Sequence, residues 1–227
     1  MAIYEDRRQA GQLLAQALED YRYQSNVLVL GLPRGGVPVA YEVAASLNAE
    51  LDVMIVRKLG HPVQPEFAIG AIASGGVRIL NEDAQIEADL IDEITEAELP
   101  ELHRREKAYR GHRPYPSFHD RCVILVDDGL ATGSTMRAAI AAVDSQHPPE
   151  IVVAVPVAPE KTVEQLRQLV DNVVCLACPS TFFAIGQFYD DFSQTSDEAV
   201  HELLKRSWSR TDYSHSPQKS AREPRER

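Results

Sequence analysis

The sequence predicts an α/β protein built on a doubly wound parallel sheet. Short runs rich in Val, Ile and Leu alternate with stretches whose apolar residues recur at helical spacing. Continuous apolar runs are typical of strands that a parallel sheet buries on both faces. The runs cover residues 26–32, 52–59, 123–126, 150–157 and 171–178. Because strands and helices alternate, we expect right-handed crossovers that place helices on both faces of the sheet.

The length of 227 residues fits one domain, which we place at residues 1–210. It begins with an amphipathic helix over residues 4–21, on which Arg7 and Arg8 are expected to form a solvated face. The tail, residues 211–227, is polar and contains Pro and several Arg. Such a segment buries too little apolar surface to order itself, so we predict that it is disordered.

Between the second and third apolar runs the pattern changes. Residues 67–80 contain two apolar stretches separated by a Gly-Gly pair, which predicts a hairpin. Residues 83–113 are charge-rich with helical spacing, and Pro100 is expected to break or kink that helix. A last helix is expected over residues 196–208.

Charge and hydropathy exclude several classes of partner. The net charge of −11 disfavours nucleic acid and anionic membranes. No apolar run approaches the ~20 residues that a membrane span needs, and the first residues lack the pattern of a signal peptide. We therefore expect a cytoplasmic protein.

Three cysteines are present, at Cys122, Cys175 and Cys178. The spacing of the last two is that of a metal-ligand or redox pair, but no second pair and no nearby His accompany them. Buried thiols in strands are the simpler expectation.

The stretch from Val123 to Thr135 carries most of the chemistry. Asp127 and Asp128 follow a buried strand directly, at the edge where open α/β sheets bind their ligands. The small and hydroxyl residues that come next lead into a helix, so backbone N–H groups, hydroxyls and the helix N-terminus together form a phosphate cradle. The cradle consists of Ala131, Thr132, Gly133, Ser134 and Thr135.

Two further segments place cations at the same edge. The first apolar run ends in Pro33-Arg34-Gly35-Gly36, where the glycines allow close approach of a ligand and Arg34 adds a positive charge. The second run ends in Arg57 and Lys58, which would face the same crevice if it lies next in a parallel sheet. A solvent-exposed basic pair at a strand end is the alternative.

The stretch 123–135 resembles the motif with which type I phosphoribosyltransferases bind 5-phosphoribosyl-1-pyrophosphate (PRPP). That motif has four apolar residues, two acidic residues, a few small residues and then Thr-Gly-x-Thr, and every part is present here. The resemblance extends to about Leu204. It implies the fold of that family with a small hood, and transfer of ribose 5-phosphate from PRPP to a nucleobase-like acceptor with release of pyrophosphate.

The resemblance also implies roles for the matching positions. The cradle 131–135 would bind the 5-phosphate. Asp127 and Asp128 would accept hydrogen bonds from the ribose hydroxyls, stabilise charge at the anomeric carbon, and hold Mg²⁺ indirectly through those hydroxyls or water. Pyrophosphate would be bound by Arg34, Gly35, Gly36, Arg57 and Lys58. Arg34 and Lys58 would assist its departure, and no residue is identified as the general base.

Two local features follow from the same resemblance. The family often has a non-proline cis peptide in the pyrophosphate loop, so we expect one around Leu32–Gly35. Residues 60–66 break all periodicity and match the mobile loop that closes over the active site.

Residues 179–192 are similar to the hood of hypoxanthine-guanine phosphoribosyltransferases. By this likeness Phe183 would stack on the base and Asp190 would contact its edge. The alternative is that the aromatic residues of this segment pack in the core. Ala131 stands where those purine enzymes have Asp, which makes a 6-oxopurine substrate doubtful and leaves the acceptor open.

Two other functions remain compatible with these residues. One is a catalytically silent regulator that senses PRPP. The other is a phosphoribosyl hydrolase, or a transferase onto an acceptor other than a base. The resemblance makes a homodimer reasonable.

Overall fold

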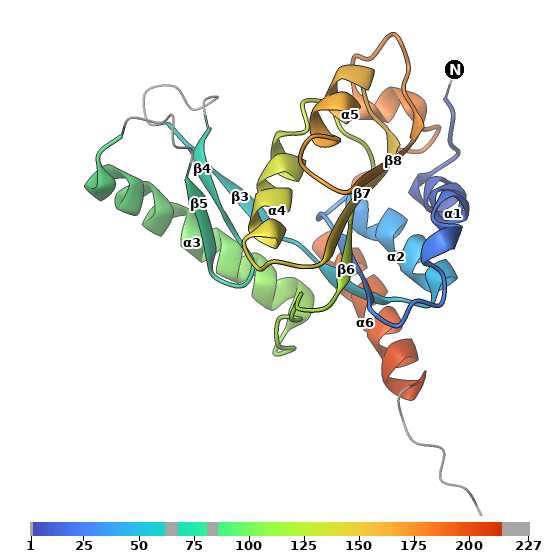
Figure 1. Cartoon of the computed structure of the whole chain (residues 1–227), viewed down its shortest axis with the longest axis horizontal. Helices are drawn as coiled ribbons and strands as arrows, with labels where there is room; N and C mark the ends of the chain where they lie inside the picture. Colours follow the sequence, from blue (N-terminus) through green and yellow to red (C-terminus); the bar gives the residue numbers. More distant parts are fainter. Residues whose placement is uncertain (1, 62–67, 81–85, 215–227) are drawn as a thin grey trace, which may run out of the picture.

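The structure is a computed structural model that describes residues 2–61, 68–80 and 86–214. Its centre is a parallel sheet with the strand order β2-β1-β6-β7-β8 (Figure 1). The strands are β1 (Val27–Gly31), β2 (Glu50–Val53), β6 (Cys122–Val126), β7 (Glu150–Val157) and β8 (Asn172–Ala177). Every residue of β1 and β6 is buried, as the continuous apolar runs predicted.

Helices cover both faces of this sheet, so the prediction of a doubly wound α/β fold is confirmed. Alternate strand residues point to opposite faces: Val29 packs in one core cluster and Leu30 in the other. One cluster contains residues of α1 (Arg7–Ala17), α2 (Gly36–Leu47) and α6 (Asp197–Ser214). The other contains residues of α4 (Ser134–Asp144) and α5 (Glu160–Leu166). Short 3-10 turns complete the described elements at η1 (Glu19–Tyr21) and η2 (Ile185–Phe188).

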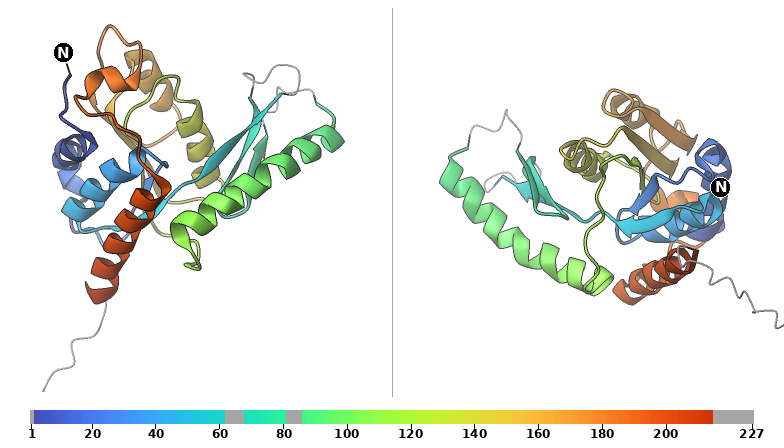
Figure 2. Two further views of the ribbon diagram at one scale, coloured as in Figure 1. Left: turned by 180° about the vertical axis from the view of Figure 1, so that it is seen from behind. Right: turned by 60° about the horizontal axis from the view of Figure 1, so that its bottom comes forward.

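A second, antiparallel sheet forms an arm beside the central one (Figures 1 and 2). Its strands are β3 (Val56–Gly60), β4 (Ala68–Ala73) and β5 (Val77–Leu80), and α3 (Ala88–Arg110) and α4 both pack against it. The described residues of β4 and β5 confirm the predicted hairpin. Most of the predicted mobile loop, residues 60–66, lies outside the described residues.

The strand predicted over residues 52–59 is wrong. The chain leaves the central sheet after Val53, at its edge strand, and enters the arm at Val56. Because the residues at the junction are all apolar, the sequence contains no signal for the change of sheet. Arg57 and Lys58 therefore lie in an antiparallel strand of the arm.

Two helices differ from the prediction. The predicted break at Pro100 is absent, because α3 runs through this residue, and Pro100 is exposed to solvent, so the carbonyl that loses its donor can be hydrated instead. α6 continues past the expected end at Trp208 to Ser214, which makes residues 211–214 helical. Residues 215–227 lie outside the described part. None of the described helices is long and apolar enough to cross a membrane.

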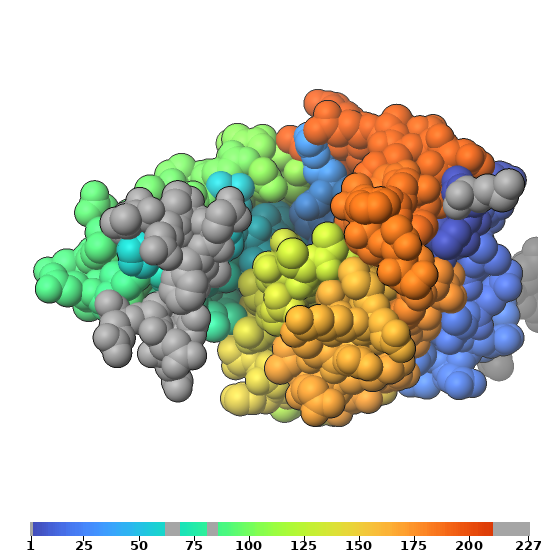
Figure 3. All heavy atoms as spheres, turned by 90° about the horizontal axis from the view of Figure 1, so that it is seen from above, coloured from blue at the N-terminus to red at the C-terminus, as the bar shows by residue number. Residues whose placement is uncertain are grey.

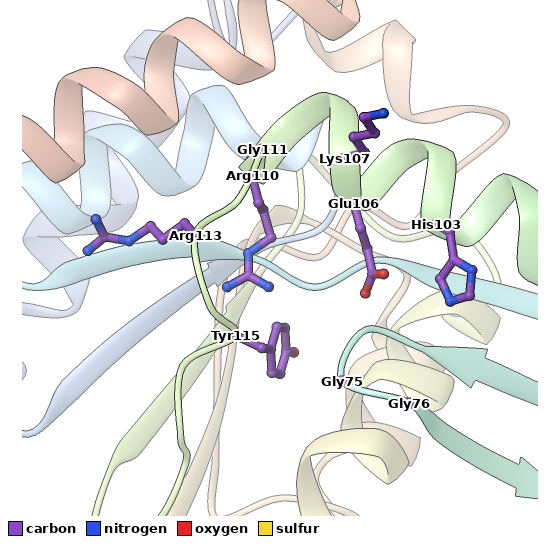
Figure 4. A pocket seen from close by; sticks show the side chains of 9 residues that line it. All are labelled: Gly75, Gly76, His103, Glu106, Lys107, Arg110, Gly111, Arg113 and Tyr115. Carbon is purple, nitrogen blue, oxygen red and sulfur yellow. The ribbon is translucent and has the colours of Figure 1, made fainter.

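A buried ion pair joins the edge of the central sheet to α3. Arg110 Nε lies 2.9 Å from Asp52 Oδ1, and these two side chains are only 6% and 1% exposed. The guanidinium also donates to Pro114 O at 2.6 Å and lies 4.7 Å from the ring centroid of Tyr115. Figure 4 shows Arg110 above this ring, beside a cavity of about 480 Å³.

Loss of one partner of this pair should destabilise the protein strongly. Asp52→Ala leaves the guanidinium buried without its carboxylate, so we expect the unfolding free energy to fall by about 3–5 kcal/mol in urea titrations. Arg78→Ala, which breaks a pair with Asp92 that is 43% and 59% exposed, is the matched control and should cost about 0–1 kcal/mol. Equal losses of unfolding free energy in the two variants would contradict the conclusion that the buried pair stabilises the fold.

Candidate active site

Two loops meet at the carboxyl ends of β1 and β6. The strands pair in register, with Gly31 opposite Val126, so the loops that follow start side by side. The glycines of the first loop approach the acidic pair of the second: a Cβ on Gly35 would overlap the Asp128 carboxylate, and one on Gly36 would lie 2.8 Å from the Asp127 Cα. The sequence predicted close approach of a ligand, and the structure shows close approach of the acidic loop.

The peptide bond between Pro33 and Arg34 is cis, within the segment where the resemblance predicted one.

Asp128 is held by groups from both ends of the chain. Arg7 Nε donates to its Oδ2 at 2.7 Å, and the Tyr189 hydroxyl donates to its backbone carbonyl at 2.6 Å. Arg7 is only 12% exposed, and its Nη1 also donates to Ser193 O. The predicted solvated face is therefore wrong for Arg7 and correct for Arg8, which is 74% exposed.

Asp127 has a different environment. Its Oδ1 accepts the backbone N–H of Asp128 at 2.8 Å, and Asp127 is one of the residues that line a cavity. Burial and then the charge of Asp128 raise the pKa of Asp127 well above its usual range. Burial also raises the pKa of Asp128, although Arg7 lowers it. Two carboxyls, one half-buried and one buried, thus share one nearby arginine, and a further positive charge would be stabilised there.

The cavity beside Asp127 has a volume of about 200 Å³. It is lined by Asp127, residues 129–136 and Ile185. Thr132 Oγ1 and Ser134 Oγ lie 3.0 Å apart at the start of α4, and Gly133 adopts a φ of +71° in the turn between them. The helix N-terminus and these hydroxyls favour an anion.

Figure 3 looks onto this edge of the molecule, which is hollowed between α3 and the start of α4. The acidic pair and the phosphate cradle predicted from the sequence are therefore brought together in space. The predicted cations are distributed differently.

Arg34 lies near the start of α6. It is 38% exposed, and its Nη1 is 3.7 Å from Asp197 Oδ1. Asp197 also accepts a hydrogen bond from the Tyr109 hydroxyl at 2.8 Å. Arg57 donates to Glu98 Oε2 at 2.7 Å within the arm. The expectation that Arg57 and Lys58 end a parallel strand of the central sheet is wrong, and their contact with pyrophosphate stays a prediction.

Some residues of the 179–192 segment are buried in the core and others are exposed to solvent. Phe188 and Tyr189 are buried against Tyr4, which is the core packing given as the alternative. Phe183 is 85% exposed, and Ile185 contacts the site instead by lining the cavity. Asp190 is exposed, and its backbone N–H donates to Tyr4 O. Base recognition by Phe183 and Asp190 stays a prediction.

Together these features define an α/β protein with an acidic pair beside a phosphate cradle at the carboxyl edge of a parallel sheet. A family model for the phosphoribosyl transferase domain matches residues 2–193. The chain belongs to the phosphoribosyl transferase family.

Individual proteins agree with this assignment. Proteins of two Mycobacterium tuberculosis strains, CDC 1551 and H37Rv, carry the provisional name of phosphoribosyl transferase and are each 46% identical to this chain over 211 residues. The matched region is 91% of this chain and 47% of each relative, so the chain spans about half the length of these curated relatives. The crystal structure of the protein TT1426 from Thermus thermophilus is similar with a TM-score of 0.83 and 43% identity, covering 91% of this chain and 99% of that one.

Replacement of Asp127 should stabilise the protein. Because the pKa of this carboxyl is higher in the folded than in the unfolded state, the folded state binds more protons, and stability falls as pH rises from the usual carboxyl pKa through the raised one. Asp127→Asn removes this dependence and should gain about 0.5–2 kcal/mol at neutral pH. Urea unfolding at a series of pH values measures both effects. Asp120→Asn, at a position 87% exposed before β6, is the control, and a neutral-pH loss in Asp127→Asn alone would contradict the argument.

Arg7 and Arg8 provide a matched pair of variants. Arg7→Ala leaves Asp128 buried without its cation and should destabilise the protein by about 2–4 kcal/mol. Arg8→Ala should change the unfolding free energy by less than about 0.5 kcal/mol. Equilibrium urea unfolding distinguishes the two, and similar small effects would show that the buried ion pair is not important for the fold.

Proposed function

We propose that this chain is a PRPP-dependent phosphoribosyltransferase that transfers ribose 5-phosphate to a nucleobase-like acceptor. The observation that carries the proposal is that one cavity joins Asp127 to the hydroxyls and helix N-terminus at Thr132 and Ser134. A phosphorylated ribose needs an anion site for its phosphate and, close by, acceptors for its hydroxyls, and both are present in the turn after β6. Membership of the family supports the same reaction class.

In this reaction the bond from the anomeric carbon to pyrophosphate breaks and a bond to the acceptor forms. The segment 131–135 binds the 5-phosphate and fixes the ribose against the acidic pair. Asp127, which faces the cavity, accepts from a ribose hydroxyl and stabilises the positive charge that develops at the anomeric carbon. Asp128 holds Asp127 in place through its backbone N–H, and Arg7 restrains Asp128 in turn.

Pyrophosphate departs toward the loop at the end of β1. Gly35 and Gly36 keep this loop close to the acidic pair, and Arg34 at its edge offers a guanidinium for bidentate contact with phosphate oxygens. Arg57 and Lys58 approach from the arm in this proposal.

Mg²⁺ fits the donor set. The carboxylates are hard oxygen ligands, and because burial raises the pKa of both, a cation beside them would stabilise their charged forms. Among the described residues no group of three or more His, Cys, Asp or Glu side chains is arranged to hold a metal ion. Asp127 and Asp128 would therefore hold Mg²⁺ together with oxygens of the ligand or water. When bound, the ion neutralises charge on the leaving pyrophosphate.

The exposure of Phe183 favours a second candidate. An acceptor held by stacking needs a closed aromatic slot, and this ring is 85% exposed. A PRPP-sensing regulator without an acceptor requires no such slot. The two functions share the PRPP site and differ in whether a base changes binding and whether pyrophosphate is released.

Calorimetric titration with PRPP and Mg²⁺, with and without a panel of purines and pyrimidines, tests the proposal. A transferase should bind PRPP more tightly with one base and release pyrophosphate, whereas PRPP binding without either effect identifies the regulator.

Asp127→Asn should lower turnover by about 10²–10³-fold because it removes charge aimed at the anomeric carbon. Asp120→Asn is the control. Absence of PRPP binding by the unmodified protein would refute both functions.

A further inference from the structure

Two thiols lie at the end of β8, where the 179–192 segment begins. The Sγ atoms of Cys175 and Cys178 are 3.7 Å apart. Cys178 is exposed and Cys175 is partly buried, with its Sγ 3.3 Å from Ala177 O. The expectation of buried thiols is met by Cys122 and is wrong for Cys178. The proposed transfer reaction uses neither member of the pair.

The environments of the two sulfurs are unequal. Burial, and then the charge of Cys178, raises the pKa of Cys175 to about 12, so little of this thiol is ionised at neutral pH. The exposed Cys178 is the sulfur that a reagent in solution can reach. Within the described part of the chain, no further ligand completes a group of three that could hold a metal ion. An accessible thiol with a second thiol in van der Waals contact is the arrangement of a reactive and a resolving cysteine.

We propose that Cys175 and Cys178 form a reversible intrachain disulfide that ties the start of the 179–192 segment to β8. The co-reactant is a low-molecular-weight disulfide such as oxidised glutathione. Cys178 as thiolate attacks one of its sulfurs and releases one glutathione, and Cys175, losing its proton, attacks Cys178 Sγ and releases the second. Two protein thiols are oxidised, one glutathione disulfide is reduced, and the two thiol protons end on the two glutathione molecules.

The pair lies close in the chain to a residue that lines the cavity, so the disulfide can affect the cavity wall. Gln187 Nε2 donates to Thr181 O at 3.2 Å, which closes the segment that begins after Cys178 into a compact turn. Ile185, within that turn, lines the cavity and packs so closely on Gly129 that a Cβ there would be 2.7 Å from its Cγ2. A covalent link at Cys178 therefore restrains the side of the cavity formed by Ile185.

Incubation of the reduced protein with glutathione disulfide, followed by peptide mapping without reductant, tests the chemistry. We expect a Cys175–Cys178 linked peptide, a mass lower by about two daltons than the reduced form, and full reversal by dithiothreitol. Cys122 should remain a thiol and serves as the internal control. A glutathione adduct that persists on Cys178, or two free thiols after long incubation, would overturn the proposal. Neither PRPP nor activity is needed, so this result is independent of the proposed function.

Hydrogen exchange tests the coupling to the segment. In the oxidised protein the backbone amides of residues 180–187 should exchange about threefold or more slowly, because the disulfide restricts local opening. Cys178→Ser treated in the same way should show no change, and Cys175→Ser should retain the mixed disulfide that it cannot resolve. Unchanged exchange in an oxidised protein with the mapped disulfide would disprove the coupling.

Discussion

The ion pair between Arg7 and Asp128 is the contact on which the site depends. Arg7 comes from the first helix, Asp128 from the turn after β6, and the two lie 121 positions apart in the chain. The same guanidinium lies 3.9 Å from the ring centroid of Phe192 and donates to Ser193 O. One buried cation thus joins the N-terminal helix, the acidic pair and the end of the 179–192 segment. The carboxylate it binds would otherwise be an uncompensated charge in the interior.

Close backbone approach sets the second constraint. The register of β1 and β6 starts two loops at the same level, and Gly35 and Gly36 bring them into contact. Any side chain at these two positions would displace the acidic pair. The two glycines therefore determine where the carboxylates lie, in addition to leaving space for a ligand. The geometry of the site is therefore determined by packing between loops before any ligand arrives.

The features of the fold and the site that could be predicted from the sequence are those whose pattern lies within one continuous stretch of residues. Central strands such as 123–126, the acidic pair and the cradle 131–135 each follow from a local pattern, and sheet topology then brings them together. The role of Arg7 has no local signal, because its partner is distant and a basic residue near a helix start usually faces solvent. The break between β2 and β3 was missed because residues on both sides of it are equally apolar. The exposure of Phe183 depends on how its neighbours Phe188 and Tyr189 fill the core.

The electrostatics of the acidic pair are consistent with the ligand of the proposed function. Asp128 has Arg7, whereas Asp127 has a backbone N–H and the repulsion of its neighbour, so the pair is held in a state that disfavours full ionisation. In the proposed function, a ligand that brings hydroxyl donors and a divalent cation would offset both the desolvation of the two carboxyls and their mutual repulsion. The two carboxyls have different surroundings: Asp128 is paired with Arg7, whereas Asp127 lines the cavity and is the carboxyl that faces the ribose in the proposed reaction.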